Sequence, residues 1–209
     1  MNTEGKVKKP IFKRWWFWAI VVVIAIGILG QPHDSPDKDA NTPSASNDAS
    51  QGKADSDDKS EDKKETAKAL DAEITAICLS AENDYKKFLD IAAAGTASDL
   101  DLYNAAKTVK SNLNYYNYTQ LSDVKGKGID EYKQSVSLYI FSMSEVADKA
   151  MKYIDDPVTS KLSKYQDAAN SVNNYTYDVA LKRLSFLADA GFTTDEITTI
   201  TSTESGSNG

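Results

Sequence analysis

The chain has very few of the residues on which most catalytic and metal-binding sites depend. Its 209 residues include one cysteine, Cys78, and one histidine, His33. A single cysteine excludes an internal disulfide and a cysteine-rich zinc site, and a single histidine excludes a multi-histidine metal site. The same scarcity leaves little general-base chemistry near neutral pH. We therefore predict a protein that is not an enzyme and that uses no cofactor and no metal ion, with Cys78 as a buried, inert thiol.

Positive charge is also in short supply. The chain has 24 Lys and Arg residues against 31 Asp and Glu residues, which gives a formal net charge of −7. A surface that wraps nucleic acid needs a basic face, so we predict no nucleic-acid partner. The charge is unevenly distributed, because residues 1–14 carry a net +4, residues 31–65 a net −5 and residues 66–209 a net −6. This partition indicates three physical environments rather than one globule.

A single uncharged run follows the basic N-terminal tail. Residues 15–30 read WWFWAIVVVIAIGILG. As a helix the run spans about 24 Å, slightly less than a hydrocarbon core of about 30 Å, and two flanking cations reach the headgroups to compensate. Three indole rings gather at one end, where they favour the membrane interface. We predict a transmembrane anchor over residues 15–30, held at the bilayer surface by Lys13, Arg14, Trp15, Trp16 and Trp18.

The basic tail also predicts the orientation of this anchor. Five basic residues precede the apolar run and a net acidic segment follows it, which places residues 1–14 in the cytoplasm and the chain after residue 30 outside the cell. A cleaved signal peptide is one alternative, although the small residues Ala25 and Gly27 would place the cut inside the apolar run. A buried core helix is the other, and it lacks an apolar partner nearby in the sequence.

The stretch KKPIFKRWWFWAIVVVIAIGILG resembles the N-terminal anchor of many small surface proteins of Gram-positive bacteria, which are often encoded by prophages. In those proteins a basic segment rich in tryptophan precedes a Val- and Ile-rich span and a Ser-, Asp- and Lys-rich linker. The resemblance covers residues 8–65. It implies a style of anchoring and a cell-surface location, and it implies no activity.

The segment after the anchor is almost free of apolar side chains. Residues 31–65 contain no aromatic residue and no Leu, Ile, Val or Met. Such a segment buries too little apolar area to offset the cost of ordering the chain. We predict a disordered acidic linker that spans roughly 30–35 Å as a random coil and holds the following domain away from the membrane.

The remaining chain has the periodicity of helices. Residues 66–190 contain one Pro and only three Gly, and apolar residues recur at intervals of three and four. Gly95 and Gly191 are placed to end helices, and Ser98 to cap the start of one. We predict an all-α fold: an antiparallel bundle of about four helices over residues 66–200, followed by a flexible tail over 201–209. The expected helices cover residues 60–94, from 98 to about 117–119, 129–154 and 157–190, with residues 121–128 as a loop.

The third expected helix carries the clearest pattern, a heptad stripe of apolar residues. A stripe of this kind packs either inside the bundle of its own chain or against a second copy in a homodimeric coiled coil. Short connections to neighbouring helices favour the first interpretation. The stripe consists of Ile129, Tyr132, Val136, Tyr139, Met143, Val146, Ala150 and Tyr153.

Tyrosine gathers in two similar stretches, NYYNYT and NNYTYD. Neighbouring tyrosines on a helix point in different directions, so some of them must be exposed. Tyrosine mixed with asparagine is frequent in adaptable recognition surfaces. The end of the second helix and the middle of the fourth are expected to approach each other and to form a surface for another protein or a cell-wall glycan, and amphipathic packing is the alternative. The candidate residues are Tyr115, Tyr116, Tyr118, Tyr175 and Tyr177.

These observations predict a membrane-anchored, extracytoplasmic helical module that binds an unidentified ligand. The alternative, which rests on the resemblance of the anchor alone, is a prophage-encoded surface protein for superinfection exclusion or host immunity. Beyond the ligand, the sequence indicates two partners: the lipid bilayer, through residues 15–30, and a second copy of the chain if the heptad stripe forms a dimer.

Overall fold

The protein is described by a computed structural model over residues 57–205, with side chains from 61 to 201. Every regular element in this range is helical, which confirms the all-α prediction. No helix among these residues combines the length and the apolar character needed to cross a membrane. The predicted anchor lies outside the described residues. The helices are α2 (Asp57–Ala93), α3 (Asp99–Tyr115), the π-helix η2 (Tyr116–Gln120), α4 (Leu121–Asp123), α5 (Asp130–Asp155), α6 (Thr159–Ala190) and α7 (Thr194–Ser205).

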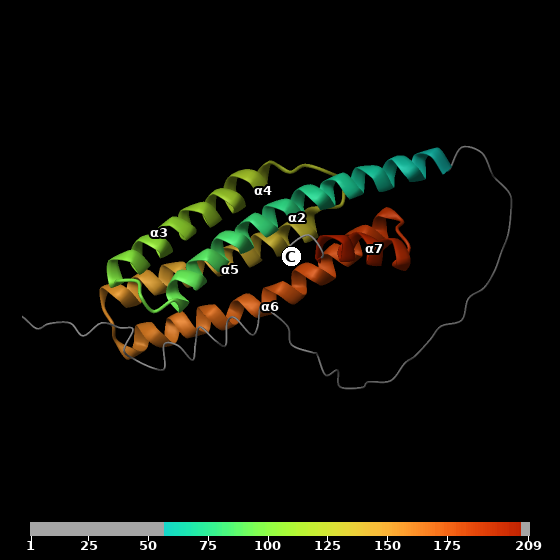
Figure 1. The fold of residues 1–209 in the computed structure, drawn as a ribbon. Helices are drawn as coiled ribbons and strands as arrows, with labels where there is room; N and C mark the ends of the chain where they lie inside the picture. The colour runs from blue at the N-terminus through green and yellow to red at the C-terminus, as the bar shows by residue number, and fades with distance from the viewer. Residues whose placement is uncertain (1–56, 206–209) are drawn as a thin grey trace, which may run out of the picture.

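Four long helical segments run alternately in opposite directions, as predicted (Figure 1). They are α2, α3 with its continuation through η2 and α4, α5, and α6. Around the bundle each packs against the next in this order, and α6 returns to α2. Helices α3 and α6 therefore occupy diagonal positions. The short helix α7 follows α6 at the end of the bundle where α2 begins.

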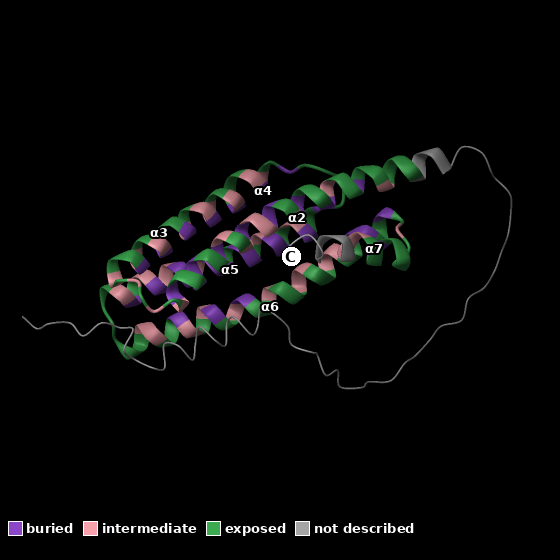
Figure 2. Ribbon diagram, in the orientation of Figure 1, coloured by how far each residue is buried: buried purple, intermediate pink, exposed green. Residues whose placement is uncertain are grey.

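Helix α5 supplies the centre of the core. All eight residues of the predicted heptad stripe, from Ile129 to Tyr153, are buried. The helix packs against α3 and α6 and also reaches α2 across the bundle. Figure 2 shows buried positions concentrated where the helices face one another. The stripe is thus used inside its own chain, and it is not available for the coiled-coil homodimer considered as the alternative.

The predicted helix ends are confirmed where small polar residues or glycine mark them. Gly95 and Gly191 have φ angles of 67° and 99°, the left-handed conformation that glycine adopts without strain. At the start of α3, the Ser98 hydroxyl accepts a hydrogen bond from the Asp101 backbone N–H, and the Asp101 carboxylate accepts one from the Ser98 N–H. This reciprocal pair satisfies two amide groups that the helix cannot satisfy itself.

The predicted linker extended too far into the domain. Helix α2 begins at Asp57, so residues 57–65 are helical and not part of a disordered segment. Tertiary contacts explain the difference, because the Lys63 ammonium donates to the Asp189 carbonyl at 2.6 Å and Lys64 pairs with Glu196 at 2.9 Å. These partners lie more than 120 residues away, beyond the reach of local composition.

The second helix also runs further than predicted. It does not fade near residues 117–119 but continues through the π-helical turn and α4 to Asp123. A π-helical turn widens the helix by one residue, and here it places Leu121 in the core. The buried Asn117 amide donates to the Ser137 carbonyl of α5 at 3.2 Å. Only the short segment before α5 is left as a connection, and within it Val124 is buried.

Residues 201–205 are helical, although a flexible tail was predicted from residue 201 onwards. Helix α7 extends to Ser205, and its residue Ile197 is buried against the core. Thr193 and Glu196 form a second reciprocal cap, in which the Glu196 N–H donates to the Thr193 hydroxyl and the Thr193 N–H to the Glu196 carboxylate. One buried isoleucine and one cap hold this short helix against the bundle.

Candidate functional site

The five candidate tyrosines do not form one surface. Because α3 and α6 are diagonal in the bundle, the expected approach of the two tyrosine stretches does not occur. Tyr115, Tyr118 and Tyr177 are more than half exposed, whereas Tyr116 and Tyr175 are partly buried against the core. The two stretches must therefore be considered separately.

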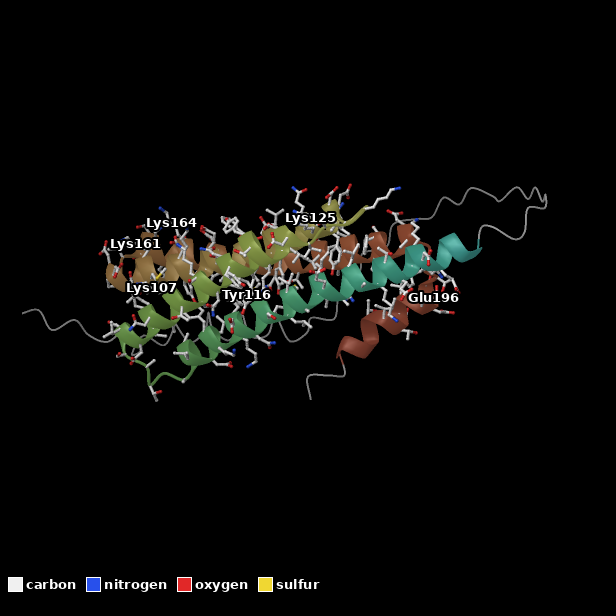
Figure 3. All side chains as sticks on the ribbon, turned by 90° about the horizontal axis from the view of Figure 1, so that it is seen from above. Lys107, Tyr116, Lys125, Lys161, Lys164 and Glu196 are labelled. Atoms are coloured by element: carbon white, nitrogen blue, oxygen red, sulfur yellow. The ribbon has the colours of Figure 1, made fainter. Side chains whose placement is uncertain are left out.

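Tyr116 has a structural role between α2 and α3 (Figure 3). Its hydroxyl donates to the Asp84 carboxylate at 2.9 Å, and the Asn112 amide donates to the same oxygen at 2.8 Å. Partial burial raises the pKa of Asp84, but hydrogen bonds from Lys87, Asn112 and Tyr116 outweigh it and hold the pKa below its usual value. The cluster joins two neighbouring helices, and the Tyr116 hydroxyl is already committed within it.

The most open seam of the bundle lies between α2 and α6, which pack less closely than the other neighbouring pairs. A groove of about 510 Å³ follows this seam. Cys78, Tyr132 and Val179 are buried or half-buried along it, and α7 borders it at Thr201. We call this feature the α2/α6 groove. Its other lining residues are Thr75, Leu79 and Glu82 of α2 and Thr176, Ala180, Arg183 and Leu184 of α6.

A buried ion pair joins the two helices that form the groove. Arg183 donates from Nε and Nη2 to the two carboxylate oxygens of Asp71, each at 2.8 Å. Asp71 is 1 % exposed, so this carboxylate depends on the guanidinium for its stability as an ion. Sequence reasoning missed the pair, although Asp71 lies on the apolar side of its helix and Arg183 is the sole arginine after Arg14.

Most other polar groups of the groove are partly or fully buried, and this burial shifts their pKa values or fixes their hydrogen bonds. Burial raises the pKa of the Glu82 carboxyl, although this group accepts a hydrogen bond from the Tyr139 hydroxyl at 2.9 Å. The Tyr132 hydroxyl lies 3.3 Å from the Thr75 hydroxyl. Cys78 is buried as predicted, and burial raises the pKa of its thiol, which keeps it protonated and a poor nucleophile. The groove thus offers shape, apolar contact and fixed hydrogen-bonding groups.

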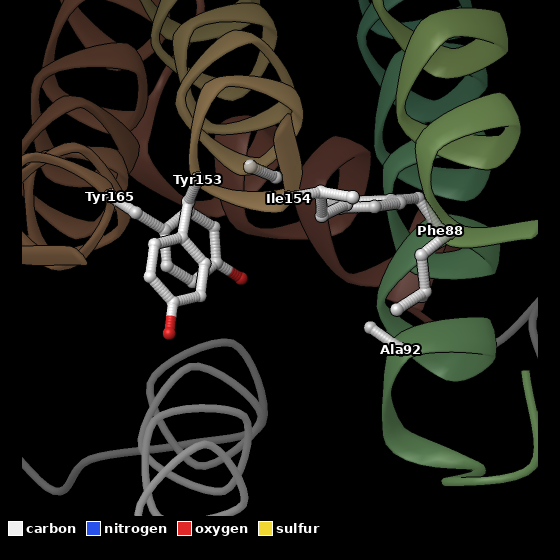
Figure 4. A pocket seen from close by; sticks show the side chains of 7 residues that line it. Phe88, Ala92, Tyr153, Ile154 and Tyr165 are labelled. Atoms are coloured by element: carbon white, nitrogen blue, oxygen red, sulfur yellow. The ribbon is translucent and has the colours of Figure 1, made fainter. Parts of the chain in front are cut away.

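A much smaller cavity lies at the opposite end of the bundle (Figure 4). Its volume of about 20 Å³ is room for roughly one water molecule. Phe88, Leu102, Tyr153 and Tyr165 are among the residues that line it. The size of this cavity marks a gap in packing and not a ligand site.

The described residues thus define a class of protein, an antiparallel four-helix bundle with a short fifth helix beside one end. No family model, curated protein or solved structure matches this chain.

Proposed function

We propose that this protein is a membrane-anchored binding module whose ligand occupies the α2/α6 groove. In this proposal residues 15–30 anchor the chain, the linker holds the bundle outside the cell, and the groove captures a partner. The observation that carries the proposal is the open seam between α2 and α6. Of the neighbouring helices, α2 and α6 pack least closely, and their seam leaves apolar side chains beside an unfilled groove.

The exposed apolar residues indicate the chemistry of the ligand. Tyr177, Leu181 and Leu184 are 62 %, 44 % and 42 % exposed and are spaced by four and three residues, so they share the outer side of α6. Leu184 also lines the groove, opposite Leu79 of α2. A long groove between two helices, with apolar side chains at one-turn intervals, suits an amphipathic helix of a partner protein. Tyr177 is the candidate tyrosine that belongs to this surface.

The buried ion pair supports the same proposal. Asp71 and Arg183 hold α2 and α6 together beside the groove, which Arg183 lines, so the cavity is present before the ligand arrives. A preformed site avoids part of the entropic cost of binding. The Arg183 charge is neutralised by Asp71, which favours a ligand that binds mainly through apolar contacts.

The test is partner capture from intact cells by the full chain, with crosslinking before solubilisation. We expect Leu184→Asp to reduce capture at least tenfold, because it places a carboxylate against the apolar side of the ligand. Leu100→Asp is the matched control, because Leu100 is 67 % exposed on α3 at the other end of the bundle. Equal capture by the wild-type chain and both variants, with unchanged helical circular dichroism, would contradict the proposal.

A further inference from the structure

A second apolar surface lies on the other side of α6, where this helix packs against α5. Leu138 and Phe141 are 40 % and 43 % exposed, although most neighbouring positions of α5 are buried. They lie one turn apart on the outer side of the helix, away from the heptad stripe. Tyr175 of α6 is half-buried beside them. We call this surface the α5/α6 face, and it consists of Leu138, Phe141, Ser142, Ala168, Ser171 and Tyr175.

The α5/α6 face combines large side chains with a hollow. A groove of about 340 Å³ lies between Phe141 and Tyr175, and small side chains of Ser142, Ala168 and Ser171 line it. A protruding phenylalanine next to a hollow of adequate size is a self-complementary shape. An interface related by a two-fold axis requires this property, because the same patch must serve both copies.

We propose that the α5/α6 face pairs with the same face of a second copy of this chain. With the two-fold axis parallel to the helices and along the seam, α5 of each copy lies against α6 of the other. Phe141 of each copy then enters the hollow of its partner beside Tyr175 and Ser171. This dimer uses the outer side of α5, so the buried heptad stripe stays within each chain.

The charges around the face suit this pairing. At one end Glu131 and Lys182 form an ion pair at 2.7 Å. At the other end α5 presents Glu145 with Lys149, and α6 presents one base and one acid. Asp178 of α6 lies one turn from Lys182 and interacts with it, so four acids and three bases leave the face with a net charge of only −1 per copy. The pair on α6 is Lys164 and Asp167, and Figure 3 labels the first.

The outer side of α2 differs from the α5/α6 face in its charge. On the outer side of α2, the groove lined by Asp62, Glu65 and Glu73 presents three acids and no base. Two copies of that surface would repel each other, as the net charge of −6 on residues 66–209 implies for the domain as a whole. The nearly balanced charges of the α5/α6 face reduce this obstacle to self-association.

The available area indicates a weak but specific dimer. Residues 131–149 of α5 extend about 27 Å, and two adjacent helices present a width of about 20 Å. The face thus offers about 500 Å² per copy, or about 1,000 Å² in total, the lower limit for a specific interface.

Disulfide crosslinking of the full chain in membranes tests the dimer. In the proposed arrangement Ser171 lies close to the two-fold axis, so Ser171→Cys should form a disulfide-linked homodimer on mild oxidation. Thr108→Cys, at an exposed position on the outside of α3, is the matched control. The native Cys78 is buried and contributes little background. We expect at least fivefold more homodimer from Ser171→Cys than from Thr108→Cys.

Two further variants make the result specific. Adding Phe141→Asp to Ser171→Cys should abolish the crosslink without loss of helicity, because Phe141 is exposed within each copy. Adding Leu184→Asp should leave the crosslink unchanged, which separates this inference from the proposed ligand groove. Equal crosslinking at positions 171 and 108, a crosslink that survives Phe141→Asp, or an adduct with a different protein would overturn the proposed dimer.

Discussion

Arg183 of α6 holds Asp71 of α2 through two parallel hydrogen bonds of 2.8 Å, across 112 residues of sequence. The pair joins α2 to α6 across their loosely packed seam. Because Asp71 is almost completely buried, it tolerates neither loss of its partner nor a change in partner geometry. The stability of the bundle and the shape of the α2/α6 groove therefore depend on the same contact.

Removing one partner of this pair should be much more costly than removing both. Arg183→Met leaves an uncompensated buried carboxylate, and we expect a loss of about 3–5 kcal/mol in the free energy of unfolding. The double variant Asp71→Leu with Arg183→Met replaces both charges by apolar side chains and should recover most of that loss. Chemical denaturation measures both values. Similar destabilisation by the single and double variants would show that the loss of stability in Arg183→Met does not come from an unpaired buried carboxylate.

The two sides of α5 should respond differently to truncation. Met143 is fully buried in the heptad stripe, and Met143→Ala should cost about 2–5 kcal/mol of unfolding free energy. Phe141→Ala deletes more atoms than Met143→Ala does. Phe141 is nevertheless 43 % exposed, so Phe141→Ala should lower the free energy of unfolding by less than about 1 kcal/mol in dilute solution. Denaturation midpoints below 1 µM protein check this difference. Equal losses would mean that the outer side of α5 is covered within the monomer.

Glu82 should make stability depend on pH in one direction. Burial raises the pKa of this carboxyl in the folded state, so its ionised form is disfavoured there. The resulting cost is absent below the unfolded-state pKa, near 4.3, and is fully present once the pH exceeds the raised folded-state value. Glu82→Gln should therefore raise the denaturation midpoint at pH 7 and leave it nearly unchanged at pH 3.5. A stabilisation that is the same at both pH values would contradict this explanation.

The hydroxyl groups of two buried tyrosines should contribute to the free energy of unfolding with opposite signs. The Tyr85 hydroxyl is buried and has no hydrogen-bond partner among the described residues, whereas the Tyr139 hydroxyl donates to Glu82. Tyr85→Phe removes an unsatisfied polar group and should stabilise the bundle by about 1 kcal/mol. Tyr139→Phe, the matched change, should destabilise it by a similar amount. Destabilisation by Tyr85→Phe, or unchanged stability in Tyr139→Phe, would show that the assignment of partners is wrong.

Much of the fold follows from local patterns. The heptad stripe of α5 predicted the core because every third or fourth residue is apolar over seven helical turns, and the caps at Gly95, Ser98 and Gly191 were marked by residue type. The end of α3 was harder to predict. Its stretch YNYTQ is polar, and only the distant contact of Asn117 with Ser137 shows why the helix continues.

The candidate site depended on information that a single sequence lacks. Which helices are diagonal is decided by how all four pack, and this arrangement separates Tyr118 on η2 from Tyr177 on α6. The groove arises because α2 and α6, the first and last long helices, close the bundle loosely. Neither the periodicity of α2 nor that of α6 reveals this, although an arginine in an otherwise arginine-free domain was a usable signal.

Photocrosslinking in intact cells tests the central claim, that the α2/α6 groove binds a partner. A photoreactive phenylalanine analogue replaces either Leu184, in the groove, or Leu100, at the far end of the bundle, in the full chain. We predict one dominant protein adduct from position 184, its loss when Tyr177→Ala and Leu181→Ala are added, and no such adduct from position 100. No adduct at position 184, or the same adducts at both positions, would contradict the proposed function.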